Sequence, residues 1–476
     1  MSISEYAHSD ALGLAELVAK RAVTPAELME EAIARAERLN PMLNAIVFKD
    51  YERALDMAKG DLPKGPFTGV PFLYKDIFAL VKGTPTRQGS RFFPAFPSDH
   101  DSYLTMHFKK AGLVAFGKTN VPEFGLVPTT EGKLYGAARN PWNLAHSTGG
   151  SSGGSAASVA AGIVPMAHGN DGGGSIRIPA SCCGLVGLKP SRGRVSYGPD
   201  FAEAVDGLSV DLAVSRSVRD TAAALDVASG SEPGDPYCAP AAPASYLKAS
   251  KEKPRRLRIG FAKKRQDGVP LHPDCVTAVE HAAKLCAGLG HTVEEASPDI
   301  DQSTLLPSFM ALWCGNLASI IDFLSRLTGQ TPSLDNLEGL TLGLYEAGKR
   351  VSAIEYLQAK MMLSRAARAA AQFHQTYDLW LSSTLGTPPI KLGVLNMDEQ
   401  NAEKAFAPLI DYVPFTAMQN VTGQPAINLP LFWNSDGLPI GVQFVGPYGD
   451  ELTLLQLATE LEQAQPWFER YASINV

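Results

Sequence analysis

The sequence has few cysteines for its length, six among 476 residues. Two of them, Cys182 and Cys183, are adjacent, and no Cys-x-x-Cys pair or Cys/His ligand spacing occurs. This pattern excludes a disulfide scaffold and a structural zinc site, so we predict free thiols and no metal. No charged segment followed by an apolar run opens the chain, and no run of about 18 apolar residues occurs. We therefore expect a soluble, cytoplasmic protein that does not bind a membrane.

Positive charge is also scarce: the chain has 42 Lys and Arg residues and 49 Asp and Glu residues, so its net charge is -7. One dense basic stretch, residues 251–258, lies in a polar connector and is read as solvated surface. Nucleic acid is therefore not an expected partner. Apolar residues make up 45% of the whole chain, which is compatible with one large domain over residues 1–476, as a monomer or a homodimer.

Helix signals dominate the first 60 residues, which we interpret as an N-terminal helical arm. Thr24 and Glu27 form a capping box with Pro25 at the first helical position, and helices are predicted over residues 10–21 and 25–39. From Gly69 onward, short apolar runs alternate with helical or glycine-rich segments. This rhythm predicts an α/β fold with a large mixed, mostly parallel sheet sandwiched by helices.

The second half of the chain contains three recognisable units. Residues 257–261, 273–289 and 291–295 are predicted to form a strand, a helix and a parallel strand. Residues 302–376 are a long helical stretch without a clear strand, which we interpret as an insertion that caps a pocket. Two apolar runs flank Asp436-Gly437 and predict a hairpin over residues 426–445, followed by a helix over 451–463.

One motif is misleading. Residues 112–119, GLVAFGKT, match the GxxxxGK[ST] pattern of a phosphate-binding loop. The residues between the glycines are apolar and look like a strand, and Pro122 obstructs a helix that would begin at Lys118. Nucleotide binding is therefore not expected.

Two glycine-serine clusters, residues 149–155 and 172–175, are the first candidates for catalysis. A bare glycine run lets backbone N–H groups converge on one oxygen, as acyl transfer requires, although a flexible surface turn has the same composition. A serine nucleophile also needs a base. His168 is the histidine nearest to Ser175 in sequence and is one candidate for the base, but it could instead be a buried histidine at the end of a strand. The GxSxG elbow is absent, so a Ser-His-Asp hydrolase fits poorly. Lys75 ends an apolar strand and is a second candidate for the base, with a salt bridge to Asp76 or another carboxylate as the alternative role.

At this point the sequence resembles the amidase signature family over nearly its whole length. The family's motifs occur in order as Val70–Asp76, Gly149–Gly193 and Asp436–Gly446, with further markers at Gly117–Gly125, Ser215–Gly230 and Thr422–Pro430. The segment GNDGGGSIRIPASCCG, residues 169–184, is most similar to the branch of 6-aminohexanoate cyclic-dimer hydrolase-like amidases and urethanases. The resemblance is weakest over residues 232–375.

The resemblance implies a cofactor-free amide hydrolase with a Ser-Ser-Lys triad. Ser175 is the implied nucleophile, Ser151 the bridging serine after a cis peptide bond, and Lys75 the base. The lysine must be neutral to accept a proton, so its pKa must fall toward about 7 through burial. The implied oxyanion donors are the backbone N–H groups around Gly172, Gly173, Gly174 and Ser175.

The resemblance also assigns supporting residues. Asp171 and Arg177 are expected to pair and hold the nucleophile loop, and Ser152 to add a hydrogen bond. Phe124 and Gly125 are expected at the pocket edge. Three positions depart from the usual family pattern: Thr148, Asn170 and Gly172.

The substrate is expected to be a bulky or apolar small-molecule amide, with esters and carbamates as possible alternatives. Apolar side chains in the helical insertion support this expectation: Phe309, Leu312, Trp313 and Phe323. Such aromatics are also common in plain cores, and Cys314, a further pocket candidate, could be an inert buried thiol. The alternative function is the glutaminase subunit of a tRNA-dependent amidotransferase, which needs a small polar pocket.

Overall fold

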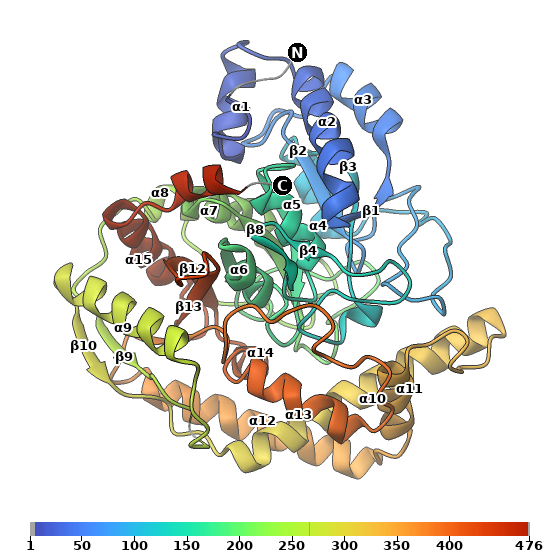
Figure 1. Cartoon of the computed structure of the whole chain (residues 1–476), viewed down its shortest axis with the longest axis vertical. Coiled ribbons are helices and arrows are strands. Elements are labelled where there is room, and N and C mark those ends of the chain that lie inside the picture. Colours follow the sequence, from blue (N-terminus) through green and yellow to red (C-terminus); the bar gives the residue numbers. More distant parts are fainter. Residues whose placement is uncertain (1–4, 266, 475–476) are drawn as a thin grey trace.

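A mixed eight-stranded sheet forms the centre of the protein (Figure 1). The computed structural model describes residues 5–265 and 267–474. The strand order is β10-β9-β11-β13-β12-β7-β8-β6. The strands are β6 (Met166–Asp171), β7 (Val186–Lys189), β8 (Val210–Ser215), β9 (Arg258–Phe261), β10 (Thr292–Glu295), β11 (Leu379–Ser383), β12 (Ala426–Trp433) and β13 (Pro439–Val445).

The sheet is mixed and flanked by helices, as predicted, but most of its strand pairs are antiparallel, which corrects the prediction that parallel pairs dominate. Only β9 pairs in parallel, with β10 and with β11. The other pairs, from β11–β13 across to β8–β6, are antiparallel. Strands β6, β7 and β8 are buried along their length, and a buried strand is compatible with either direction, so burial does not reveal direction.

Two predicted units are confirmed. Strand β9, helix α9 (Pro273–Gly288) and parallel strand β10 form the expected βαβ unit. Strands β12 and β13 form the expected antiparallel hairpin, and helix α15 (Glu451–Ala464) follows it. The connector before β9 also contains a short helix, α8 (Tyr246–Ala249).

A second sheet of three strands carries the N-terminal part of the site. Its order is β1-β3-β2, with β2 (Pro71–Lys75) parallel to β3 (Val114–Thr119) and β1 (Ile46–Lys49) antiparallel to β3. The capping box at Thr24 starts helix α2 (Pro25–Leu43), which follows α1 (Ala11–Ala19). Residues 1–60 therefore contain a strand as well as helices. The GxxxxGKT stretch is a strand, β3, as predicted.

Residues 302–376 form three helices at the bottom of Figure 1. These are α10 (Gln302–Thr328), α11 (Gly339–Lys349) and α12 (Ala353–Phe373), and α13 (Ala402–Tyr412) lies beside them. By length and composition α10 is the one described helix that could cross a membrane, but half of its apolar window is buried inside the protein. It packs against α11 and α12.

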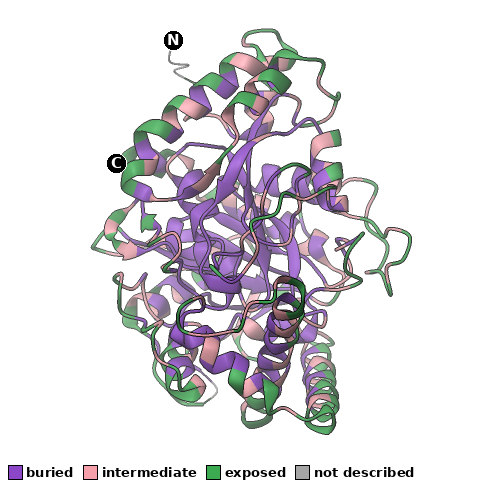
Figure 2. Ribbon diagram, turned by 90° about the vertical axis from the view of Figure 1, so that its right-hand side faces the viewer, coloured by how far each residue is buried: buried purple, intermediate pink, exposed green. Residues whose placement is uncertain are grey.

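The remaining elements connect these units and cover the sheets. Buried residues concentrate in the sheets and on the inner faces of the helices, whereas exposed residues lie on the outer helical faces (Figure 2). The remaining elements are α3 (Tyr51–Lys59), α4 (Tyr103–Lys110), η1 (Glu123–Gly125), β4 (Arg139–Asn140), β5 (Asn143–Ser147), α5 (Gly153–Ala160), α6 (Arg177–Cys183), α7 (Val218–Ala228), α14 (Ala417–Thr422) and η2 (Phe468–Ser473).

Candidate active site

Lys75, at the end of β2, is fully buried and hydrogen-bonded to neutral side chains. Its Nζ donates to Ser151 Oγ at 2.8 Å and to Asn170 Oδ1. Burial lowers the pKa of Lys75 to about 7, while the carboxylates of Asp211 and Asp171 act in the opposite direction. The neighbouring Asp76 instead accepts hydrogen bonds from the Arg87 backbone and the Tyr135 hydroxyl. The amine is thus directed toward a serine hydroxyl and is not neutralised by Asp76.

Ser151 lies just before helix α5, and the Gly150–Ser151 peptide bond is cis, as the resemblance implies. Gly125 lies close to this hydroxyl. Its φ is +66°, and a Cβ at this position would lie 3.1 Å from Ser151 Oγ. Glycine is therefore required here both by backbone conformation and by the close approach.

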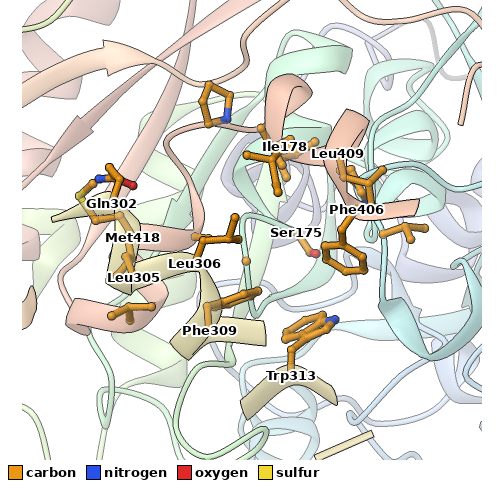
Figure 3. A pocket seen from close by; sticks show the side chains of 18 of the residues that line it. Ser175, Ile178, Gln302, Leu305, Leu306, Phe309, Trp313, Phe406, Leu409 and Met418 are labelled. Atoms are coloured by element: carbon orange, nitrogen blue, oxygen red, sulfur yellow. The ribbon is translucent and has the colours of Figure 1, made fainter. Parts of the chain in front are cut away.

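Ser175 lies two residues before helix α6, and its side chain points into a cavity (Figure 3). Ser152 ties its loop to the neighbouring segments: the Ser152 backbone N–H donates to the Ser175 carbonyl, and its hydroxyl donates to the Asn170 carbonyl, both at 3.3 Å. Ser151 and Ser175 line the same small cavity. The structure therefore brings Lys75, Ser151 and Ser175 into one region, with a hydrogen bond between the first two.

Asp171, at the end of β6, organises the loop that carries Ser175. Its carboxylate receives a two-pronged contact from the buried Arg177 guanidinium, with both distances 2.9 Å. Burial raises the pKa of Asp171, but Arg177 outweighs this effect and the pKa is about 2. The same carboxylate accepts the backbone N–H of Gly174 at 2.7 Å and of Ile176 at 3.2 Å.

These bonds correct one predicted oxyanion donor. The Gly174 N–H is used in the turn closed by Asp171, three residues earlier, and is not free to bind a substrate oxygen. The prediction failed because aspartate side chains commonly bind the backbone N–H groups that follow them, an effect that a glycine count does not include. Gly172 and Gly173 each line one of two cavities that Ser175 also lines.

A polar network behind Lys75, most of it buried, was not predicted from the sequence. Asn170 Nδ2 donates to Ser209 Oγ at 3.4 Å, Ser209 bonds the Tyr197 hydroxyl at 2.8 Å, and Tyr197 donates to Asp211 at 2.9 Å. The only signal was that Asn170 departs from the family pattern. Because these partners come from β6, β8 and a loop, sequence spacing could not bring them together.

His168 lies on the Lys75 side of this network. Its Nδ1 accepts the Lys75 backbone N–H at 3.3 Å, and its Nε2 lies 3.5 Å from Asp211 Oδ2. Its ring is fully buried in β6. Of the two interpretations of His168, the structure therefore favours a buried histidine in a strand over a catalytic base.

Two cavities of unequal size meet at Ser175. The larger has a volume of about 430 Å³ and is enclosed mainly by apolar side chains of α10, α13 and α14 (Figure 3). The smaller has a volume of about 40 Å³. Gly125 and Trp313 border both cavities, and Phe124 borders the smaller one.

The helix period explains which residues of α10 reach the cavities. Phe309, Trp313 and Leu317 lie on one face, and the rings of Phe309 and Trp313 stack with centroids 5.2 Å apart. Cys314 is rotated by about 100° from Trp313. Its carbonyl contacts Gly348 of α11, and burial raises the pKa of its thiol to about 11.

Cys314 is absent from the described lining of both cavities, which corrects its assignment as a substrate contact. Phe323 also lines neither cavity, and 58% of it is exposed. Within the described residues, no group of three or more His, Cys, Asp or Glu side chains could hold a metal ion.

The chain belongs to the amidase family, whose sequence profile matches residues 27–455. It is therefore an amidase, a hydrolase of carbon–nitrogen bonds. It is 39% identical to the 6-aminohexanoate-cyclic-dimer hydrolase of Paenarthrobacter ureafaciens, over 97% of this chain and 96% of that protein.

Solved structures agree with this assignment. A 6-aminohexanoate cyclic dimer hydrolase complexed with substrate superimposes with a TM-score of 0.93 at 38% identity, covering 98% of each chain. One subunit of the glutamyl-tRNA(Gln) amidotransferase of Thermotoga maritima has a TM-score of 0.77 at 25% identity, covering 98% of this chain and 97% of that one.

Proposed function

We propose that this amidase cleaves apolar small-molecule amides through a covalent acyl-enzyme on Ser175, with Ser151 and Lys75 as the proton relay. The observation that carries this proposal is the 2.8 Å hydrogen bond between Lys75 Nζ and Ser151 Oγ in a fully buried setting. A buried amine with a pKa of about 7 is substantially neutral at neutral pH and can accept a proton.

The reaction has two halves. Lys75 takes the proton of Ser151, Ser151 takes that of Ser175, and Ser175 Oγ forms a bond to the amide carbon. The negative charge on the carbonyl oxygen is stabilised by the N–H groups of Gly172, Gly173 and Ser175. The relay then returns a proton to the nitrogen as the carbon–nitrogen bond breaks, and the amine leaves. Water, deprotonated by the same relay, hydrolyses the ester and restores Ser175.

The larger cavity supports an apolar substrate. Its volume of about 430 Å³ exceeds the roughly 150 Å³ cavity that accommodates benzene in an engineered protein. A cyclic amide such as the 6-aminohexanoate cyclic dimer, named for the relative, is a suitable first substrate. Because esters and carbamates form the same kind of acyl-enzyme, they are secondary candidates.

The glutaminase alternative is less well supported. Free glutamine carries an α-carboxylate, and binding it calls for a positive group in the pocket. Among the described residues that line the two cavities, the charged residue is Asp267, an anion. Glutaminase activity that depends on added partner subunits would nevertheless favour this alternative over ours.

The test is covalent labelling with an alkyl fluorophosphonate, followed by intact-mass measurement and peptide mapping. We expect one adduct, on Ser175, in the active enzyme. Lys75→Ala and Ser151→Ala should slow labelling strongly, whereas Ser152→Ala, which alters a neighbouring hydroxyl outside the relay, should slow it less. Labelling of another serine, or normal labelling without Lys75, would refute the triad.

A further inference from the structure

The two cavities at Ser175 differ in their access to the proton relay. Ser151 borders the smaller cavity, and Gly173 borders the larger. When the carbon–nitrogen bond breaks, the leaving nitrogen must receive a proton through Ser151 and must therefore lie within hydrogen-bond reach of its hydroxyl. The amine half of the substrate is thus directed into the smaller cavity and the acyl half into the larger one.

The indole ring of Trp313 forms part of the wall of the smaller cavity, and it lies against Gly172. A Cβ at position 172 would lie 3.2 Å from Cζ3 and 3.3 Å from Cη2 of Trp313, whereas Ser209 Cβ is 3.8 Å away. The φ of Gly172 lies outside the left-handed region, so the backbone itself admits a side chain. The ring of Trp313 therefore occupies the space that a side chain at 172 would need.

We propose that Trp313, held over Gly172, limits the size of the amine that this enzyme can release. This inference rests on the proposed acyl transfer at Ser175. The ring also stacks on that of Phe309, and Asn316 and Leu317 continue the wall of the smaller cavity along α10. Trp313 is 9% exposed, so most of its side chain is packed against neighbouring residues.

The volumes define the expected selectivity. A space of about 40 Å³, at roughly 10–15 Å³ for each water, holds about three water molecules. Ammonia and methylamine fit this space, whereas butylamine and benzylamine require the ring to move. The restriction applies to open-chain amides, because a cyclic amide folds its amine half back toward the acyl half and can place the ring in the larger cavity.

The test compares hexanamide with its N-methyl, N-butyl and N-benzyl derivatives, which share one acyl group. Wild type should prefer the first two. In Trp313→Ala, kcat/KM for the N-benzyl amide relative to hexanamide should rise about 10-fold or more, within the range for enlarged apolar pockets. Leu409→Ala, which enlarges only the larger cavity, should alter the dependence on acyl length and leave the amine preference unchanged.

Gly172→Ala provides a second, independent measurement. The added methyl group should displace Trp313 and selectively reduce cleavage of the N-methyl amide, and this selective loss should disappear in the Trp313→Ala background. Equal selectivity changes in both backgrounds, or an unchanged amine preference in Trp313→Ala, would overturn the inference. Normal fluorophosphonate labelling of Ser175 in these variants would leave the proposed function intact, whereas labelling elsewhere would refute that function first.

Discussion

Replacing Lys75 with methionine should abolish activity and yet stabilise the protein at neutral pH. Burial lowers the pKa of this amine from 10.5 to about 7. In the unfolded chain the amine keeps its usual pKa and is protonated at pH 7, so folding must release a proton. The difference between the two pKa values corresponds to roughly 5 kcal/mol, of which about 4 kcal/mol opposes folding at pH 7.

Methionine removes this cost but leaves two buried groups without their partner. The Lys75 amine donates to Ser151 and to Asn170, and each lost hydrogen bond costs about 1 kcal/mol. We therefore expect Lys75→Met to be about 2 kcal/mol more stable than wild type at pH 7. Methionine has nearly the length of lysine, so the packing of β2 should change little.

The pH dependence makes this prediction decisive. The unfavourable contribution of Lys75 is complete below pH 7 and is lost as the pH rises toward 10.5, where the unfolded amine is also neutral. Between pH 7 and 9.5 the difference between variant and wild type should therefore shrink by about 3 kcal/mol. Paired urea unfolding curves at the two pH values measure it, because other titrating groups affect both proteins equally. A difference independent of pH, or a methionine variant less stable at pH 7, would refute a buried neutral amine.

Three further predictions concern the same site. Asp211→Asn removes a carboxylate that raises the pKa of Lys75. The acid limb of the pH profile of kcat/KM, expected near pH 7, should therefore move to lower pH. An acid limb that stays at the same pH would contradict this electrostatic role of Asp211. Asp171→Asn leaves the buried Arg177 without its counter-charge and should lower the free energy of unfolding by about 3–5 kcal/mol, measured by urea titration; a loss below 1 kcal/mol contradicts it. Gly125→Ala should lower kcat about 100-fold, because its methyl group would press on Ser151, while circular dichroism remains native; near-normal kcat excludes this contact.

The sequence contains enough local information to predict the individual elements of this fold but not their directions in the sheet. The capping box at Thr24 and the Asp-Gly turn at Asp436 act over a few residues, and both predictions are confirmed. Strand direction depends on how distant segments meet. The buried runs of β7 and β8 are compatible with either direction, and their antiparallel pairing becomes visible only in the assembled sheet.

The site, like the fold, contains parts that the sequence predicts and parts that depend on how distant segments meet. Motif resemblance indicated Lys75 and Ser151, and the structure places them in hydrogen-bond contact. The partner on the other side of the amine, Asn170, was visible only as an unusual residue in a motif. Its contact depends on the spacing between β2 and β6, which no local pattern encodes. The size of the amine pocket likewise depends on Trp313, which lies 141 residues after Gly172 in sequence and touches it in space.

The backbone N–H groups of the loop around Ser175 differ in role. The Gly174 N–H is bound by Asp171 and holds the loop in place, whereas the N–H groups of Gly172, Gly173 and Ser175 are the proposed oxyanion donors. The carboxylate of Asp171 binds one N–H on each side of Ser175, from Gly174 and Ile176, and Arg177 anchors the carboxylate in turn. With both flanks fixed, the N–H groups before Gly174 and at Ser175 itself are held in place before substrate arrives. Donors that are already oriented need no rearrangement when negative charge develops, which is the condition under which they lower the barrier most. Loss of Asp171 should therefore reduce kcat even under conditions where the protein remains folded, and a variant that is folded and fully active would show that the loop does not need this anchor.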